Sequence, residues 1–189
     1  MNRESKLFII SGPSGVGKTT IAQNLLKEIE GLARSISCTT RERRETERDG
    51  VDYRFISSDR FQVLIKEDAF LEWAEILGNL YGTLKSDVEA QIARGNDVLL
   101  CIDVQGATQV LEKKPDAIAI FIMPPNIEEL RTRLIKRGES KLEIDKRIKL
   151  AKEEIECISS YHHVVYNDVL HKAIDLVKYI VCAERQKIV

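Results

Sequence analysis

The chain has 189 residues, 43% of them hydrophobic and 31% charged, with a formal net charge of −1. This length is enough for one domain with a substantial core. The near-neutral charge argues against a broad nucleic-acid-binding surface, which normally carries a basic excess, but it allows a local basic pocket for a small anion.

The first predicted element is a strand over residues 6–11, and a glycine-rich loop follows it directly. Residues 12–19 form a complete GxxxxGK[ST] motif, and an apolar-periodic helix is predicted over 18–30. In this setting backbone N–H groups converge on an anion, and the helix N-terminus adds positive potential. We expect Lys18 to reach the terminal phosphates of a nucleotide and the Thr19 hydroxyl to ligate Mg²⁺. The expected nucleotide-binding residues here are Gly12, Pro13, Ser14, Gly15, Val16, Gly17, Lys18, Thr19 and Thr20.

Short apolar runs then alternate with helical patterns, which is typical of a parallel sheet covered on both faces. The further predicted strands are 34–38, 97–103, 117–122 and 163–166, and the further predicted helices are 86–94, 105–113, 126–137, 143–160 and 169–186. Ser86 with Glu89 predicts a capping box at the start of one helix. Asn126 with Glu129 predicts the cap of another.

Residues 39–85 interrupt the alternation. A charged stretch is followed by a short helix near 59–66 and by aromatic, alternating segments that predict a small antiparallel sheet inserted into the core. We expect Phe70 and Trp73 to lie in the core of this sheet. An insertion at this point is well placed to hold a second substrate.

Residues 136–147 form a polar helix–turn–helix with Gly138 at the corner. Beyond the turn an apolar stripe predicts that the second helix packs on the body of the protein, with basic side chains beside the stripe. A mobile basic lid over a cleft is the functional interpretation. An ordinary exposed helical hairpin is the alternative.

The four cysteines are scattered without a CxxC pair, so neither a disulfide scaffold nor a zinc site is expected. The start of the chain lacks the apolar region of a signal peptide, and no stretch is long enough to span a membrane. We therefore expect a cytoplasmic protein with no membrane and no nucleic-acid partner.

Several motifs, taken in order, resemble guanylate kinase. They run from about Lys6 to about Glu184, and they are far more specific together than the phosphate loop alone. They read Ser37-Cys-Thr39-Thr40-Arg41, Arg44, Gly50-Val-Asp-Tyr53, Phe70-Leu-Glu72-Trp73-Ala-Glu75, Gly78-Asn-Leu-Tyr81-Gly82-Thr83 and Ile102-Asp103-Val-Gln105-Gly106.

The resemblance implies transfer of the γ-phosphoryl group of ATP to GMP, giving ADP and GDP, with Mg²⁺, in purine nucleotide metabolism and GMP recycling. The implied fold is α/β: a P-loop NTPase core with a parallel sheet flanked by helices, an inserted small mixed β GMP-binding subdomain, and a helical lid. The expected single domain covers residues 4–186. Its core would be 4–33, 96–135 and 160–186, the GMP-binding subdomain 34–95, and the lid 136–159.

The resemblance also implies roles for individual residues. The GMP phosphate would be held by Arg41, Arg44, Tyr53 and Tyr81, and the guanine surrounded by Ser37, Glu72, Thr83 and Asp103. The lid arginines Arg133, Arg137 and Arg147 would bridge the phosphates of the two nucleotides, and Asn167 would lie near adenine. The expected catalytic residues are Lys18, Arg41, Arg137 and Arg147. The resemblance allows either GMP or dGMP as the substrate, and either a monomer or a homo-oligomer as the assembly.

One position departs from the family pattern. The family usually has Asp-Ile-Asp before Gln-Gly, whereas this chain has Cys101-Ile102-Asp103, and strand alternation places Cys101 on the same face as Asp103. Our hypothesis is that Asp103 alone supplies the acid there, with water completing the Mg²⁺ shell. Two other functions stay open: a related kinase for another phosphorylated sugar or nucleotide, and a non-catalytic module that binds phosphorylated peptides.

Overall fold

The computed structural model describes residues 4–187, and its main sheet has five parallel strands in the order β2-β7-β1-β8-β9. The strands are β1 (Leu7–Ser11), β2 (Leu32–Arg34), β7 (Asp97–Cys101), β8 (Ile118–Met123) and β9 (His163–Tyr166). In β1 and β8 every residue except Met123 is buried, which explains their near-continuous apolar sequences. The expected parallel sheet is confirmed.

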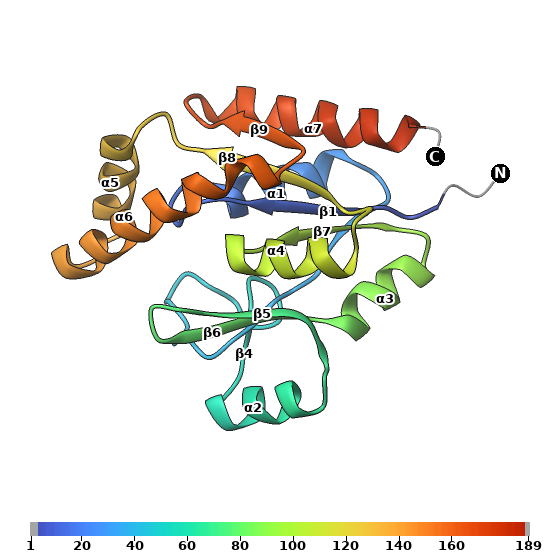
Figure 1. The fold of residues 1–189 in the computed structure, drawn as a ribbon, viewed down its shortest axis with the longest axis horizontal. Helices are drawn as coiled ribbons and strands as arrows, with labels where there is room; N and C mark the ends of the chain where they lie inside the picture. The colour runs from blue at the N-terminus through green and yellow to red at the C-terminus, as the bar shows by residue number, and fades with distance from the viewer. Residues whose placement is uncertain (1–3, 188–189) are drawn as a thin grey trace.

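Alternate residues of the strands pack in two separate layers. Phe8 and Ile10 lie in one cluster with α1 (Lys18–Glu28), α5 (Ile127–Lys136), α6 (Lys141–Glu156) and α7 (Leu170–Gln186). Leu7 and Ile9 lie in the other with α3 (Lys85–Ala93) and α4 (Val104–Lys113). Both faces of the sheet are therefore covered, and the second sheet lies beyond α4 (Figure 1).

The second sheet has four short strands in the order β4-β3-β6-β5. They are β3 (Cys38–Thr39), β4 (Arg54–Phe55), β5 (Phe70–Ile76) and β6 (Asn79–Leu84). Its pairing is mixed, because β3 and β4 are parallel while the other pairs are antiparallel. Helix α2 (Ser58–Lys66) packs Phe61 against Phe70, with the two rings stacked 4.5 Å apart.

Three local predictions were wrong. The predicted strand 34–38 is divided between the sheets: β2 ends at Arg34 beside β7, and β3 begins at Cys38. Ser86 does not cap a helix, because α3 already begins at Lys85, after Leu84. Trp73 is 38% exposed, because a β-bulge between Phe70 and Glu72 buries three consecutive residues and leaves Trp73 on the outer face.

Helices α5 and α6 form the predicted hairpin (Figure 1). The Asn126 side chain accepts a hydrogen bond from the Glu129 N–H, as predicted, and Gly138 turns the chain with a φ of +77°. Helix α6 then begins with a capping box between Ser140 and Glu143. It continues into the short 3₁₀ helix η1 (Cys157–Ser160). Among residues 4–187, no helix has both the length and the apolar character needed to cross a membrane.

Candidate functional site

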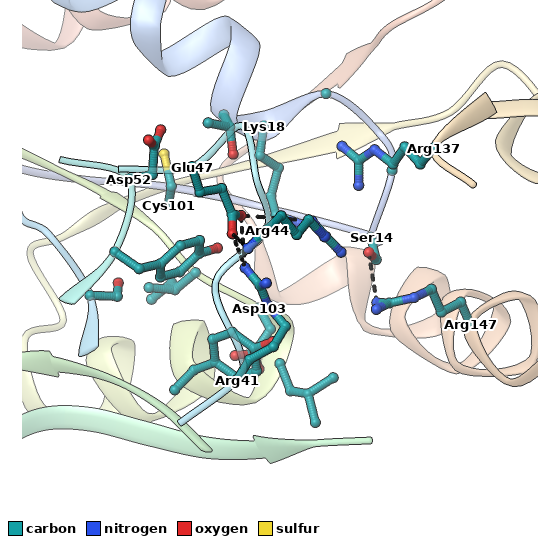
Figure 2. A pocket seen from close by; sticks show the side chains of 18 of the residues that line it. Ser14, Lys18, Arg41, Arg44, Glu47, Asp52, Cys101, Asp103, Arg137 and Arg147 are labelled. Atoms are coloured by element: carbon teal, nitrogen blue, oxygen red, sulfur yellow. Dashed lines mark hydrogen bonds and ion pairs between the residues drawn. The ribbon is translucent and has the colours of Figure 1, made fainter. Parts of the chain in front are cut away.

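A cleft of about 510 Å³ opens where β1 and β7 end, between the phosphate loop, the second sheet and α6 (Figure 2). It brings together fifteen residues that the sequence predicted: Ser14, Gly15, Gly17, Lys18, Thr19, Thr20, Ser37, Arg41, Arg44, Tyr53, Glu72, Tyr81, Asp103, Arg137 and Arg147. They come from segments up to 133 residues apart in the sequence, as the hydrogen bond from Arg147 to Ser14 shows.

The phosphate loop has the backbone that its glycines permit. Gly12 and Gly17 have φ values of +130° and +105°, which side chains rarely allow, and a Cβ at Gly12 would overlap the Ile122 carbonyl oxygen. Lys18 Nζ donates to the carbonyl oxygens of Gly12, at 2.5 Å, and Pro13, at 3.1 Å. Burial lowers the pKa of Lys18, and the negative charges of Glu154 and Asp103 oppose this shift.

On the facing side, Glu47 holds two of the predicted arginines. Both of its carboxylate oxygens accept from Nη2 of Arg41, at 2.7 and 3.0 Å, and one of them also accepts from the Arg44 N–H at 2.9 Å. The Arg41 guanidinium also lies 5.6 Å from the centre of the Tyr53 ring. Burial acts against the charge of Glu47, but these hydrogen bonds lower its pKa below the usual value.

A second carboxylate, Glu139, lies between Arg44 and Arg147. Its oxygens are 3.7 Å from Arg44 Nη2 and 2.5 Å from Arg147 Nε. Arg147 in turn donates from Nη1 to Ser14 Oγ at 2.9 Å (Figure 2). Burial lowers the pKa of Arg137, and the nearby cations Arg44 and Arg147 lower it further.

The deepest acid of the cleft is Glu72 on β5, which is only 1% exposed. Thr83 Oγ1 donates to Glu72 Oε1 at 2.5 Å, and a Cβ at Gly106 would overlap Glu72 Oε2. Burial raises the pKa of Glu72 to about 7, with the hydrogen bond from Thr83 opposing and Asp103 adding to the shift. Asp103 caps α4 through its Oδ1, which accepts from the N–H groups of Gln105 and Gly106.

Two predicted residues lie instead in a neighbouring cavity of about 330 Å³ on the other side of the loop. Arg133 and Asn167 line it, together with Gly15, Gly17, Thr20 and Arg137, which also line the main cleft. Asn167 Nδ2 donates to the Val16 carbonyl oxygen at 2.7 Å, and Arg133 donates to the carbonyl oxygens of Val16 and Asn167. Arg133 is therefore bound to the loop and is not grouped with Arg147.

Four predicted residues line neither cavity: Gly12, Pro13, Val16 and Thr83. The Gly12 and Pro13 carbonyl oxygens hold Lys18, the Val16 side chain is buried in the core, and Thr83 lies behind Glu72. These four residues therefore lie next to cleft residues without lining the cleft themselves.

Four carboxylates that line the cleft or pair with its arginines were missed: Glu47, Asp52, Glu139 and Glu154. Glu47 is one of several acids in a charged stretch, and nothing in the sequence distinguishes it from its neighbours. Glu154 follows Arg147 by seven residues, which is two helical turns, so helix α6 presents both on one face. That spacing was a usable signal. Burial raises the pKa of Glu154 to about 7, against the opposing charge of Lys18.

Cys101 and Asp103 both line the cleft, as predicted, although β7 ends at Cys101 and Asp103 is the N-cap of α4. Burial raises the pKa of its thiol, while Arg34 and Lys18 oppose the shift. The thiol is therefore neutral and supplies no charge where the family usually has a carboxylate.

The raised pKa of Glu72 predicts a pH-dependent gain in stability for Glu72→Gln. In the folded state Glu72 keeps its proton up to about pH 7, whereas in the unfolded chain it loses the proton near pH 4.5. The contribution of Glu72 to the free energy of unfolding is therefore fully present below pH 4.5 and is lost as the pH rises through 7. The amide is never charged and retains an acceptor for Thr83. We expect it to raise unfolding free energy by about 1–3 kcal/mol at pH 8 and hardly at all at pH 4.

Chemical denaturation at both pH values measures this difference. Glu75→Gln, on the exposed face of the same strand, is the matched control and should change neither value. An equal effect of Glu72→Gln at pH 4 and pH 8 would contradict a pKa raised by burial.

Comparison with known proteins agrees with this geometry. The family model described as guanylate kinase matches residues 4–184. A guanylate kinase of Caldanaerobacter subterraneus is 47% identical over 189 residues, covering 100% of this chain and 92% of the relative, and one of Thermotoga maritima is 42% identical, covering 98% and 90%. The crystal structure of guanylate kinase from Anaplasma phagocytophilum has a TM-score of 0.81 at 33% identity and covers 98% of this chain and 88% of its own. With its phosphate loop, facing arginines and buried glutamate in one cleft, the chain belongs to the guanylate kinase family, whose members phosphorylate GMP with ATP.

Proposed function

We propose that the cleft holds ATP and GMP with their phosphates facing each other, and that the chain transfers the γ-phosphoryl group to the GMP phosphate. The observation that carries this proposal is the convergence of Lys18, the facing arginines and the buried Glu72 on one cleft. Phosphoryl transfer depends mainly on positioning and charge neutralisation, which these groups supply. The products would be ADP and GDP, which places the chain in purine nucleotide metabolism and GMP recycling.

Glu72 would recognise the guanine of GMP or dGMP. Guanine presents an N1–H and an amino group on one edge, and a carboxylate accepts from both, with Ser37 and Asp103 beside it in the cleft. Adenine has no N1–H and would leave the buried carboxylate unpaired. A site of this kind rejects the wrong base by ~10⁴-fold or more. Thr83 would act by holding Glu72 in place.

The substrate phosphate would take over the hydrogen bonds that arginines now give to carboxylates. Arg41 and Arg44 with the hydroxyl groups of Tyr53 and Tyr81 would hold the GMP phosphate, since the planar guanidinium suits bidentate contact. Lys18, Arg137 and Arg147 would stabilise charge on the transferred group. No general base is needed, because the attacking phosphate oxygen is already largely ionised near pH 7.

ATP would lie on the phosphate loop. Backbone N–H groups of the loop residues that line the cleft, Ser14, Gly15, Gly17, Lys18, Thr19 and Thr20, would bind its phosphates. Arg133 and Asn167 would shape the neighbouring cavity on the adenine side. In our proposal Arg133 supports the loop carbonyl of Val16 and does not bridge the two nucleotides.

The residues at the loop fit a Mg²⁺ ion that accompanies ATP. Thr19 and Asp103 both line the cleft with oxygen donors, and the cap of α4 uses only Oδ1 of Asp103. Within residues 4–187, no group of three or more His, Cys, Asp or Glu side chains gathers as a metal site. This suits an ion bound through one or two protein oxygens, phosphate and water. When bound, the ion would neutralise charge on the β- and γ-phosphates.

We further propose a division of labour within the single domain. Residues 4–33, 96–135 and 160–186 would form the core, 34–95 the GMP-binding subdomain and 136–159 the lid, whose closure would exclude water that otherwise hydrolyses ATP. The chain would work in the cytoplasm, with no nucleic-acid partner, as a monomer or a homo-oligomer.

A coupled ADP-release assay with MgATP and each of GMP, AMP, CMP and UMP tests the function. We expect turnover with GMP alone and a loss of at least about a thousandfold in Lys18→Ala, because the terminal phosphates lose their cation. Turnover with another substrate would favour the related kinase. No turnover, combined with binding of a phosphorylated peptide, would favour the binding module.

Gly106→Ala tests the recognition of guanine. The added Cβ overlaps Glu72 Oε2, so the carboxylate must move, and we expect KM for GMP to rise at least about tenfold while KM for ATP stays the same. Gln105→Ala, with an exposed side chain on the same helical turn, is the control. An unchanged KM for GMP would exclude Glu72 as the group that binds the base.

Cys101→Asp tests whether Asp103 suffices. If Asp103 supplies the necessary carboxylate, the second carboxylate that this substitution restores should change kcat by less than about tenfold. Steady-state kinetics across a Mg²⁺ titration measure this. A gain of tenfold or more would show that Asp103 alone is not enough.

A further inference from the structure

We propose that Glu139 is a positioning residue for phosphoryl transfer, which orients Arg147 toward the phosphate loop and ties the lid to Arg44. This inference rests on the proposed function. Glu139 itself would touch neither nucleotide and would act through the two arginines.

The position of Glu139 is set by the turn between α5 and α6. It follows Gly138, whose φ of +77° reverses the chain, and it precedes Ser140, the N-cap of α6. The turn directs the Glu139 side chain inward, where it is only 9% exposed. Neither of its buried carboxylate oxygens has a well-aligned hydrogen bond among the described residues, so opposite charges provide its main interactions.

Arg147 is held at two points by this arrangement. Its Nε lies 2.5 Å from Glu139 Oε2, and its Nη1 donates to Ser14 Oγ at 2.9 Å. The hydrogen bond at Nη1 directs the planar guanidinium, and the charge of Glu139 beside Nε favours the same placement of its remaining N–H groups. Arg147 therefore faces the cleft in a fixed orientation before any substrate binds, which reduces the cost of ordering it later.

Glu139 also balances like charges that converge from different parts of the chain. Arg44 comes from residues 34–95, Arg137 is the C-cap of α5, and Arg147 lies on α6. Arg44 and Arg147 both act unfavourably on the charge of Arg137, and Glu139 opposes them. Without this carboxylate, repulsion among the arginines would push the lid away from the cleft.

Neighbouring acids of the lid are engaged differently. Glu143 completes the capping box of α6, and Asp145 pairs with Arg131 at 2.8 Å on an exposed surface. Glu154 lines the cleft, and its charge acts first on Lys18 and less strongly on Arg147. Of these lid acids, Glu139 is the one that lies at ion-pair distance from both Arg147 and Arg44, and so connects the lid with residues 34–95.

Glu139→Gln tests the inference, with Glu156→Gln on the exposed face of α6 as the matched control. We expect Glu139→Gln to lower kcat at least about tenfold with KM for ATP changed less than about threefold, because Arg147 loses its orientation and not its charge. Arg147→Lys should lower kcat in the parent chain but add less than about threefold in the Glu139→Gln background, because the two residues act as one unit.

Hydrogen exchange of the nucleotide-free chain provides a readout that needs no catalysis. Amide groups of residues 136–147 should exchange faster in Glu139→Gln than in the parent chain or in Glu156→Gln. Unchanged exchange would overturn the inference, and so would multiplicative kinetic effects of the two substitutions. Absence of turnover in the parent chain would overturn the proposed function, and the exchange comparison would still decide whether Glu139 holds the lid.

Discussion

A cleft that binds phosphate groups must bring cations together before any phosphate is present. Here Lys18, Arg41, Arg44, Arg137 and Arg147 converge on one cleft. Glu47 from residues 34–95, and Glu139 and Glu154 from residues 136–159, offset their repulsion. The arginines are thus held in place by carboxylates, and an arriving phosphate exchanges one partner for another in an already ordered site. The rest of the architecture follows from the need to hold these charges at fixed distances.

Helix α4 provides the rigid connection between the two sheets. Gln109 exchanges two hydrogen bonds with the Trp73 backbone, and Lys113 donates to the Leu71 carbonyl oxygen. The first turn of the same helix contains Gly106, which leaves room for Glu72, and its cap is Asp103. One helix therefore contacts strand β5, leaves room for the buried Glu72 and contributes Asp103 to the cleft.

The structural features that were predicted well are those that depend on residues close together in the sequence. The phosphate loop is a contiguous motif between a strand and a helix, and the parallel sheet follows from apolar alternation with helices. The arginines and tyrosines facing the loop were found through an ordered set of motifs, since no local rule brings residue 41 near residue 147. That the cleft gathers most of these residues supports the motif-based prediction, while their individual roles stay predictions.

The parts missed depend on tertiary structure. Glu139 reaches the arginines of the cleft only because a left-handed glycine reverses the chain before it, and Glu47 is distinguished from neighbouring acids only by a turn that returns to Arg44. One strand was predicted over 34–38, although the chain leaves one sheet at Arg34 and enters the other at Cys38. Tryptophan is a large apolar residue, so Trp73 was predicted in the core of the second sheet. A β-bulge, which propensity scales do not report, places its side chain on the exposed face of that sheet.

The hydrogen bonds between β5 and α4 also limit how this architecture can be inherited. Residues 34–95 resemble a separable module, yet Asp103 and the clearance at Gly106 that the buried Glu72 needs are encoded beyond the end of that segment. A recombination event at residue 95 would separate Glu72 from helix α4, which it contacts at Gly106. Exchange of substrate specificity between relatives would therefore require both segments to move together, so that the effective unit of inheritance extends to Lys113 at the end of α4.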